Sequence, residues 1–112
     1  MFDVAVVGAG VIGTLIAREL SRYRLEVALL DRSNDVANGS TKANSGIIHA
    51  GYDAAPGSNK AKFNVLGNPL FDELCDHLDV QFNRIGSLAV DFSERERTTA
   101  EQLYERGKMN GF

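Results

Sequence analysis

The sequence has few cysteines and no long uninterrupted apolar run. It has one cysteine, Cys75, so it can form no internal disulfide, which fits a reducing compartment. Its N-terminal apolar run contains Asp3, has no basic region before it and is soon followed by glycines, which argues against a signal peptide or transmembrane helix. The net charge of −3 gives no electrostatic reason to expect nucleic acid or an anionic membrane as partner. We therefore expect a cytoplasmic protein.

The 112 residues are 44% hydrophobic and 24% charged, an ordinary composition for one globular domain. The β-branched run 2–7 predicts a strand buried on both faces of a parallel sheet. Apolar residues at helical spacing over 12–20 predict an amphipathic helix, and 26–30 predicts a second buried strand. Strand, helix and strand in this order require parallel strands. The expected fold class is α/β: the N-terminal part of a doubly wound, Rossmann-like domain, incomplete in this chain, with 1–31 as its βαβ unit.

The remainder divides into a long loop and a helical part. Residues 32–58 are rich in Gly, Ser, Asn and Ala and predict a cofactor loop, because so long an irregular span is usually functional. Residues 59–112 predict helices and short strands. The expected elements are a helix from about Asn59, a helix after Asn68-Pro69 with Asn68 as its cap, strands at Val80–Arg84 and Ser87–Phe92, and a helix from the capping box Ser93–Glu96 to about Met109 with Gly111 at its C-terminal cap.

A glycine-rich turn joins the first expected strand to the first expected helix. It reads Gly8-Ala9-Gly10-Val11-Ile12-Gly13, a GxGxxG pattern. Gly8 permits a tight turn, Gly10 lets the backbone contact a pyrophosphate, and Gly13 lets the helix pack close to the strand. Val11 and Ile12 open the helix, whose N-terminus stabilises phosphate charge. The turn therefore predicts a dinucleotide site.

An acidic residue supports this assignment. Asp31 ends the second expected strand, 18 positions after Gly13, where a carboxylate can accept hydrogen bonds from ribose hydroxyls. It disfavours the 2′-phosphate of NADP, although Arg32 follows it. FAD and NAD share this half-site, so an NAD-dependent dehydrogenase domain and a non-catalytic nucleotide-binding module remain alternatives. The small and hydroxyl residues of 39–52 favour a cofactor that extends further than a mononucleotide.

The glycine turn combined with two further motifs resembles the glycine/D-amino-acid-oxidase superfamily of flavoproteins. These motifs are Asn44-Ser45-Gly46-Ile47-Ile48-His49-Ala50-Gly51 and Pro56-Gly57 followed by Lys60-Ala61-Lys62. Within the superfamily the chain is most similar to anaerobic-type FAD-dependent glycerol-3-phosphate dehydrogenases and to L-2-hydroxyglutarate dehydrogenases/oxidases. It departs from many relatives in having Asp31 rather than Glu, and in Asn68-Pro69 within what is usually one longer helix.

The resemblance implies FAD as cofactor, with Ser40 and Thr41 near the pyrophosphate and with Asn44, Ser45 and Gly46 approaching the flavin. It implies hydride transfer to the flavin from a small anionic hydroxy compound, such as glycerol 3-phosphate or a 2-hydroxy acid. The electron acceptor is not indicated. It also implies a longer intact enzyme, for which a location peripheral to the membrane is the alternative to a freely cytoplasmic one. We expect this chain alone to be inactive, and to self-associate because its sheet edges and apolar helix faces would stay exposed.

His49 is the candidate catalytic residue. The resemblance places it near the flavin, where it would serve as acid/base or as a donor to an anionic substrate. The alternative is a loop histidine that ties the backbone together through hydrogen bonds. No metal-ligand spacing is present in the sequence.

Overall fold

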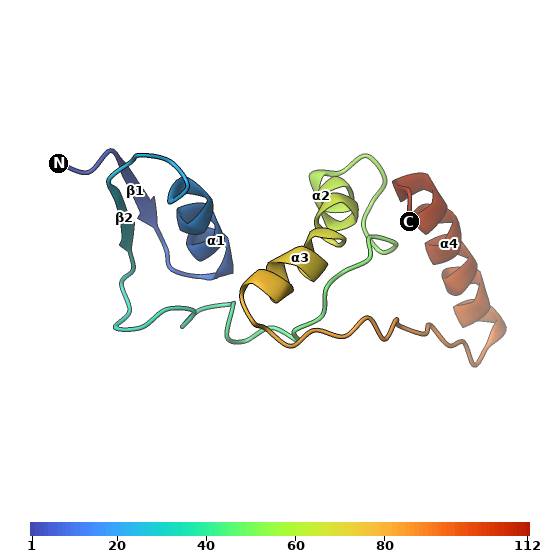
Figure 1. The fold of residues 1–112 in the computed structure, drawn as a ribbon. Coiled ribbons are helices and arrows are strands. Elements are labelled where there is room, and N and C mark those ends of the chain that lie inside the picture. The colour runs from blue at the N-terminus through green and yellow to red at the C-terminus, as the bar shows by residue number, and fades with distance from the viewer. The chain divides into compact units, whose positions relative to one another are not determined.

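The structure is a computed structural model that describes residues 1–112. In chain order its elements are β1 (Val4–Val7), α1 (Val11–Leu20), β2 (Val27–Leu30), α2 (Asn59–Gly67), α3 (Leu70–His77) and α4 (Glu94–Asn110) (Figure 1). The chain divides into two compact units, Met1–Ile47 and Ile48–Phe112.

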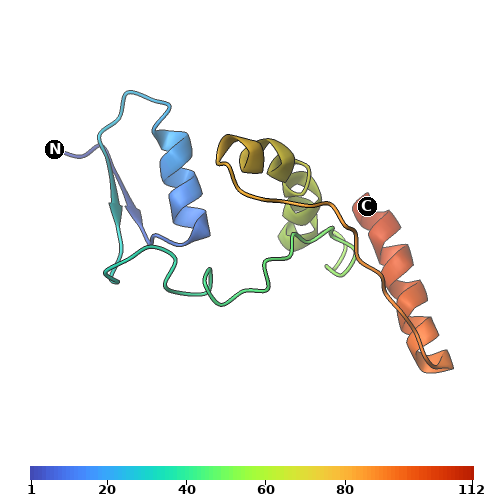
Figure 2. The same cartoon turned by 60° about the horizontal axis from the view of Figure 1, so that its bottom comes forward.

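The first unit contains the expected βαβ arrangement. β1 and β2 pair in parallel, with Val4 opposite Val27 and Val7 opposite Leu30. α1 connects them and lies along one side of the pair (Figure 2). Both strands are short and β-branched or aliphatic, and each ends directly before the residues that make the glycine turn or carry Asp31. The α/β assignment of residues 1–31 is therefore confirmed at the level of local topology.

The strands are less buried than the sequence predicts. Val6 faces α1, because its Cγ1 lies near the Cα of Gly13, 3.5 Å from where a Cβ there would stand. On the opposite face Val7 is 83% exposed and its neighbour Leu30 is 52% exposed. The prediction of strands buried on both faces is thus wrong for this chain, because one helix can cover only one face of a two-stranded sheet.

Residues 31–58 form neither helix nor strand, as expected for the loop. After it, the Ser58 hydroxyl accepts a hydrogen bond from the Ala61 amide at 3.1 Å and so caps α2. The caps of α4 also match the sequence: Ser93 Oγ accepts from the Glu96 amide, and Gly111 ends the helix in the left-handed conformation with φ of 82°. These boundaries follow from local side-chain and glycine chemistry.

The Asn68-Pro69 pair differs from its predicted role. Asn68 is the C-cap of α2 and has right-handed helical backbone angles, so it does not cap α3 as expected. Pro69 precedes α3 with φ −66° and ψ −21°. Because the ring of proline already holds φ near the helical value, the chain passes from α2 to α3 with a break of only two residues.

The strands expected at 80–84 and 87–92 are absent. This part of the chain is extended but makes no ladder hydrogen bonds. Its apolar side chains are largely uncovered: Ile85 is 89%, Leu88 88% and Phe92 89% exposed. A strand exists only when a neighbouring strand satisfies its backbone groups, and this chain supplies none for the segment.

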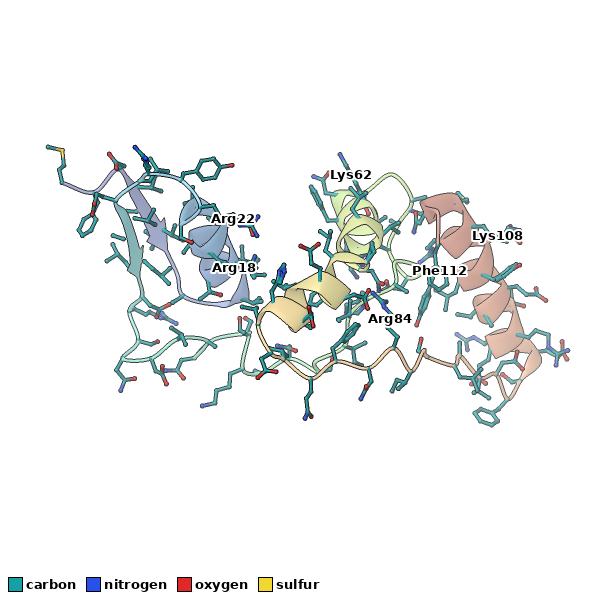
Figure 3. The ribbon with its side chains drawn as sticks, viewed as in Figure 1. Arg18, Arg22, Lys62, Arg84, Lys108 and Phe112 are labelled. Carbon is teal, nitrogen blue, oxygen red and sulfur yellow. The ribbon has the colours of Figure 1, made fainter.

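The end of α4 holds part of the loop. Asn110 Nδ2 donates to the carbonyl oxygens of Gly51 at 2.8 Å and Ala54 at 2.9 Å. Arg106 Nη1 donates to the Asp53 carbonyl at 2.9 Å. The rings of Tyr52 and Phe112 lie 5.9 Å apart; Phe112 is labelled in Figure 3. Residues 51–54 are therefore anchored although they form no regular element.

None of the helices combines the length and apolar composition needed to cross a bilayer. The structure also contains no group of three or more His, Cys, Asp or Glu residues able to hold a metal ion.

We expect the 112-residue chain to self-associate in solution, because the uncovered sheet face exposes Val7 and Leu30 beside unpaired strand edges. Size-exclusion chromatography with light scattering should give a mass above the 12.2 kDa of one chain. The double substitution Val7→Thr with Leu30→Thr should shift the mass toward the monomer. A wild-type chain that stays monomeric at high micromolar concentration would contradict this.

Candidate nucleotide-binding site

The glycine turn brings α1 against the end of β1. Gly8 has φ of +105°, a conformation that side chains other than glycine rarely adopt, and its amide donates to the Leu30 carbonyl at 2.7 Å. A Cβ at Gly13 would stand 1.8 Å from the Gly8 carbonyl oxygen, so only glycine permits this helix-strand approach. The roles that the sequence predicts for Gly8 and Gly13 in shaping the turn are present in the structure.

Asp31 reaches the turn directly. Its Oδ2 accepts a hydrogen bond from the Ala9 amide at 2.7 Å, and its Oδ1 accepts one from the Ser33 amide at 2.7 Å. The Ala9 amide first, and then the Ser33 amide, lower the pKa of Asp31, because both stabilise the charged carboxylate. Each carboxylate oxygen retains a lone pair for a further donor. The carboxylate is thus held ionised beside the glycine turn.

Thr41 brings the long loop back to the start of α1. Its Oγ1 accepts a hydrogen bond from the Val11 amide at 2.9 Å, across 30 positions of sequence. Gly10 occupies the N-cap position and has no side chain to make this bond itself. A Cβ at Gly10 would lie 3.0 Å from Thr41 Oγ1, so a side chain there would press on the loop. Thr41 therefore caps α1 from a distance and keeps its hydroxyl hydrogen for another acceptor.

The start of α1 is suited to an anion. The first turn carries no acidic residue. The amides of Gly10 and Ile12 have no acceptor within the protein, and Ile12 is 73% exposed. Free amides at a helix N-terminus, together with the helix dipole, stabilise negative charge.

Two contacts were not foreseen from the sequence. The Ala37 amide donates to the Ala9 carbonyl at 2.9 Å, and Ala37 has a positive φ of 61°. The Ser33 amide is the second partner of Asp31. Both are main-chain donors from the loop, so no side-chain motif signals them. They tie the loop to the turn near Asp31 and Thr41.

The next part of the loop is organised by Asn44. Its Oδ1 accepts from the Gly46 amide at 2.6 Å, and its Nδ2 donates to the Thr41 carbonyl. Gly46 has φ of +65°. The Asn44 side chain thus shapes the loop that follows Thr41, while Ser40 and Ser45 are exposed and make no side-chain hydrogen bond within the protein.

The structure brings together only part of the predicted set. Gly8, Gly10, Gly13, Asp31 and Thr41 converge on one turn. Arg32 is adjacent but exposed and forms no ion pair. His49 belongs to the second unit and is exposed, and its carbonyl oxygen accepts a hydrogen bond from Asn68 Nδ2 at 3.2 Å.

Substituting Gly13 by Ala should destabilise the first unit, because the added methyl group would overlap the Gly8 carbonyl and force α1 away from β1. We expect a loss of about 1–3 kcal/mol in the free energy of unfolding, measured by urea titration. Gly39→Ala is the matched control, since a Cβ there meets nothing within 4 Å. Equal unfolding curves for the two variants would contradict the close approach.

Acid should weaken the contact between Asp31 and the turn. Because the folded pKa of Asp31 lies below the unfolded value, its contribution to stability is present above the unfolded pKa of about 3.9 and is lost as pH falls through the folded pKa. Asp31→Asn should therefore show a smaller fall in stability than wild type below about pH 4. Asp35→Asn, which alters a carboxylate that accepts only from the Val36 amide, is the control. The free energy of unfolding is measured from unfolding curves across this pH range. An equal dependence of that free energy on pH in Asp31→Asn and in wild type would contradict the assignment.

The comparisons with known proteins agree with this geometry. The profile of the family described as FAD dependent oxidoreductase (DAO) matches residues 3–112. Over 111 residues the chain is 60% identical to a glycerol 3-phosphate dehydrogenase of Caloramator mitchellensis. The match covers 99% of this chain and 23% of that protein. It is 35% identical to the mitochondrial L-2-hydroxyglutarate dehydrogenase of Dictyostelium discoideum, over 99% of this chain and 25% of the relative.

A solved structure shows the same fold. Dithionite-reduced L-alpha-glycerophosphate oxidase from Mycoplasma pneumoniae with FAD bound matches with a TM-score of 0.84 and 39% identity, over 99% of this chain and 29% of that chain. The chain therefore spans about a quarter of the length of the relatives it matches. Its turn, its parallel strand pair and its match over residues 3–112 together place the chain in the family of FAD-dependent oxidoreductases.

Proposed function

We propose that this chain forms the part of an FAD-dependent dehydrogenase that binds the adenosine diphosphate half of FAD, and that the whole enzyme oxidises glycerol 3-phosphate. The proposal is supported by the convergence of Asp31 and Thr41 on the glycine turn. Asp31 Oδ2 lies 2.7 Å from the Ala9 amide nitrogen, and Thr41 Oγ1 lies 2.9 Å from the Val11 amide nitrogen. The Asp31 carboxylate would accept hydrogen bonds from ribose hydroxyls and the Thr41 hydroxyl would donate one to a phosphate oxygen, so the two residues suit the two parts of an adenosine diphosphate.

The residues present fit the cofactor. Gly10 leaves open the space that a side chain would fill beside Thr41 Oγ1, so the backbone can contact a pyrophosphate. The free amides of Gly10 and Ile12 and the hydroxyl hydrogen of Thr41 would donate to phosphate oxygens. The remaining lone pairs of Asp31 would accept from the ribose. When bound, FAD supplies the redox chemistry as a hydride acceptor, and the protein supplies position and electrostatics.

We assign the more distant part of the cofactor to the loop after Thr41. Asn44 folds residues 41–46 into a compact turn, and Gly46 with φ of +65° lets the backbone come close to a flat ligand. Ser40 and Ser45 keep exposed hydroxyls that can donate to phosphate or to the flavin. An NAD-dependent dehydrogenase domain and a non-catalytic module lack support from the matched family, whose description names FAD and oxidoreductase.

The substrate assignment rests on similarity. The 60% identical relative is named for glycerol 3-phosphate, whereas the relatives named for L-2-hydroxyglutarate are 35–38% identical. Both compounds are small anionic alcohols, so the reaction type is the same for either. We propose His49, whose imidazole belongs to an exposed residue, as the chain's donor to the anionic substrate or as its acid/base.

The test is cofactor content and substrate oxidation by the intact protein that carries this chain. It should purify yellow with FAD and reduce a dye with glycerol 3-phosphate faster than with L-2-hydroxyglutarate. Asp31→Ala should raise the Kd for FAD about 10- to 100-fold, because it removes a charged hydrogen-bond acceptor worth about 1.5–3 kcal/mol. Asp35→Ala, which removes an exposed carboxylate from the same loop, should leave FAD binding unchanged.

A colourless preparation that also fails to take up added FAD would overturn the cofactor assignment. Faster oxidation of L-2-hydroxyglutarate than of glycerol 3-phosphate would retain the cofactor and replace the substrate.

A further inference from the structure

A chain of hydrogen bonds joins three separate segments of the second unit. We call His49, Asn68, Asp72 and Arg84 the Arg84 network. Arg84 Nε donates to Asp72 Oδ1 at 2.8 Å, and Arg84 Nη1 donates to Asn68 Oδ1 at 2.8 Å. Asn68 Nδ2 in turn donates to the His49 carbonyl at 3.2 Å. Arg84, labelled in Figure 3, comes from the extended segment between α3 and α4.

The network has a direction set by its chemistry. A guanidinium group only donates hydrogen bonds, so Asn68 must turn its side-chain oxygen toward Arg84. The amide nitrogen of Asn68 then faces the His49 carbonyl, which only accepts. The opposite rotamer would set donor against donor and acceptor against acceptor. Arg84 Nη2 also donates to the Asn68 main-chain carbonyl at 3.0 Å, so both ends of Asn68 are held.

Arg84 is itself held in place. Its guanidinium carbon lies 5.1 Å from the centre of the Phe82 ring, and the Phe82 ring lies 6.5 Å from that of Phe71 in α3. The hydrogen bond between Arg84 and Asp72 raises the pKa of the arginine and lowers that of the carboxyl. Their side chains are 44% and 56% exposed, so solvent screens the ion pair and the pair by itself adds little to stability. The Arg84 guanidinium therefore contributes more to the orientation of Asn68 than to stability.

The residues that follow His49 are anchored as well. Asn110 holds the carbonyls of Gly51 and Ala54, and Arg106 holds that of Asp53. His49 precedes this anchored stretch, and its carbonyl is fixed by Asn68. The main chain is therefore held at His49 and again at residues 51–54, which follow it.

We propose that Arg84 is a positioning residue for His49: it holds the Asn68 amide in the orientation that fixes the His49 main chain, and so sets the direction of the Cα–Cβ bond that carries the imidazole. Its bearing on catalysis rests on the proposed function of His49. The effect of Arg84 on the His49 main chain does not depend on a bound cofactor, because every contact in the Arg84 network lies within this chain.

The test uses the chain labelled with carbon-13 at the histidine carbonyls. The sequence contains two histidines, so the spectrum has two resonances, and His77 in α3 serves as internal reference. Asn68→Asp keeps an acceptor for Arg84 but loses the donor to His49. It should shift the His49 carbonyl resonance toward its unfolded position and leave that of His77 unmoved. Arg84→Ala should do the same.

Two further variants separate positioning from general stability. Arg97→Ala removes an exposed arginine paired with Glu94 at 3.4 Å and without a bond to the 48–58 loop, and it should move neither resonance. In the Asn68→Asp background, Arg84→Ala should add no further shift if Arg84 acts through Asn68. An unmoved His49 resonance in Asn68→Asp, additive shifts in the double variant, or equal displacement of His77 would each overturn the proposal. FAD content is measured separately, so a failure here leaves the cofactor assignment standing.

Discussion

The first unit depends on the contact between α1 and the end of β1. With no side chain at Gly13, the helix lies where even one methyl group would overlap the Gly8 carbonyl oxygen. That closeness places the α1 N-terminus beside the ends of both strands, since the Gly8 amide also donates to Leu30. Everything else in the candidate site assembles around this position, because an anion bound there meets the helix dipole and free amides together.

Three loop contacts complete the site. The Ala9 amide binds Asp31, the Ala37 amide binds the Ala9 carbonyl, and the Val11 amide binds Thr41. Each one uses a backbone group of the turn that the helix and strands cannot satisfy themselves. The irregular loop is therefore partly ordered by the very groups that are expected to surround a nucleotide, which explains how a segment without helix or strand can carry binding residues.

In the second unit, side chains satisfy the backbone carbonyls of an irregular segment, residues 48–58. The 48–58 loop has no ladder to satisfy its carbonyls, and Asn68, Arg106 and Asn110 donate to them instead. Asparagine and arginine suit this task, because their donors reach main-chain oxygens from outside the loop. Asn68-Pro69, which looks like a simple helix break in the sequence, is the point at which two helices, the loop and the extended segment meet.

The local features could be predicted from the sequence: the order of strand, glycine turn and helix, the caps at Ser93 and Gly111, and Asp31 as a candidate ligand of the ribose. These follow from side-chain period, glycine positions and capping chemistry, which act within a few residues. The cap of Thr41 on α1 and the hydrogen bond from Arg84 to Asn68 could not be predicted in this way, because their partners lie 30 and 16 positions apart and meet only in the folded chain. The sequence pattern of 80–92 also could not show that this segment stays unpaired, because a residue pattern typical of a strand does not reveal whether a neighbouring strand is present.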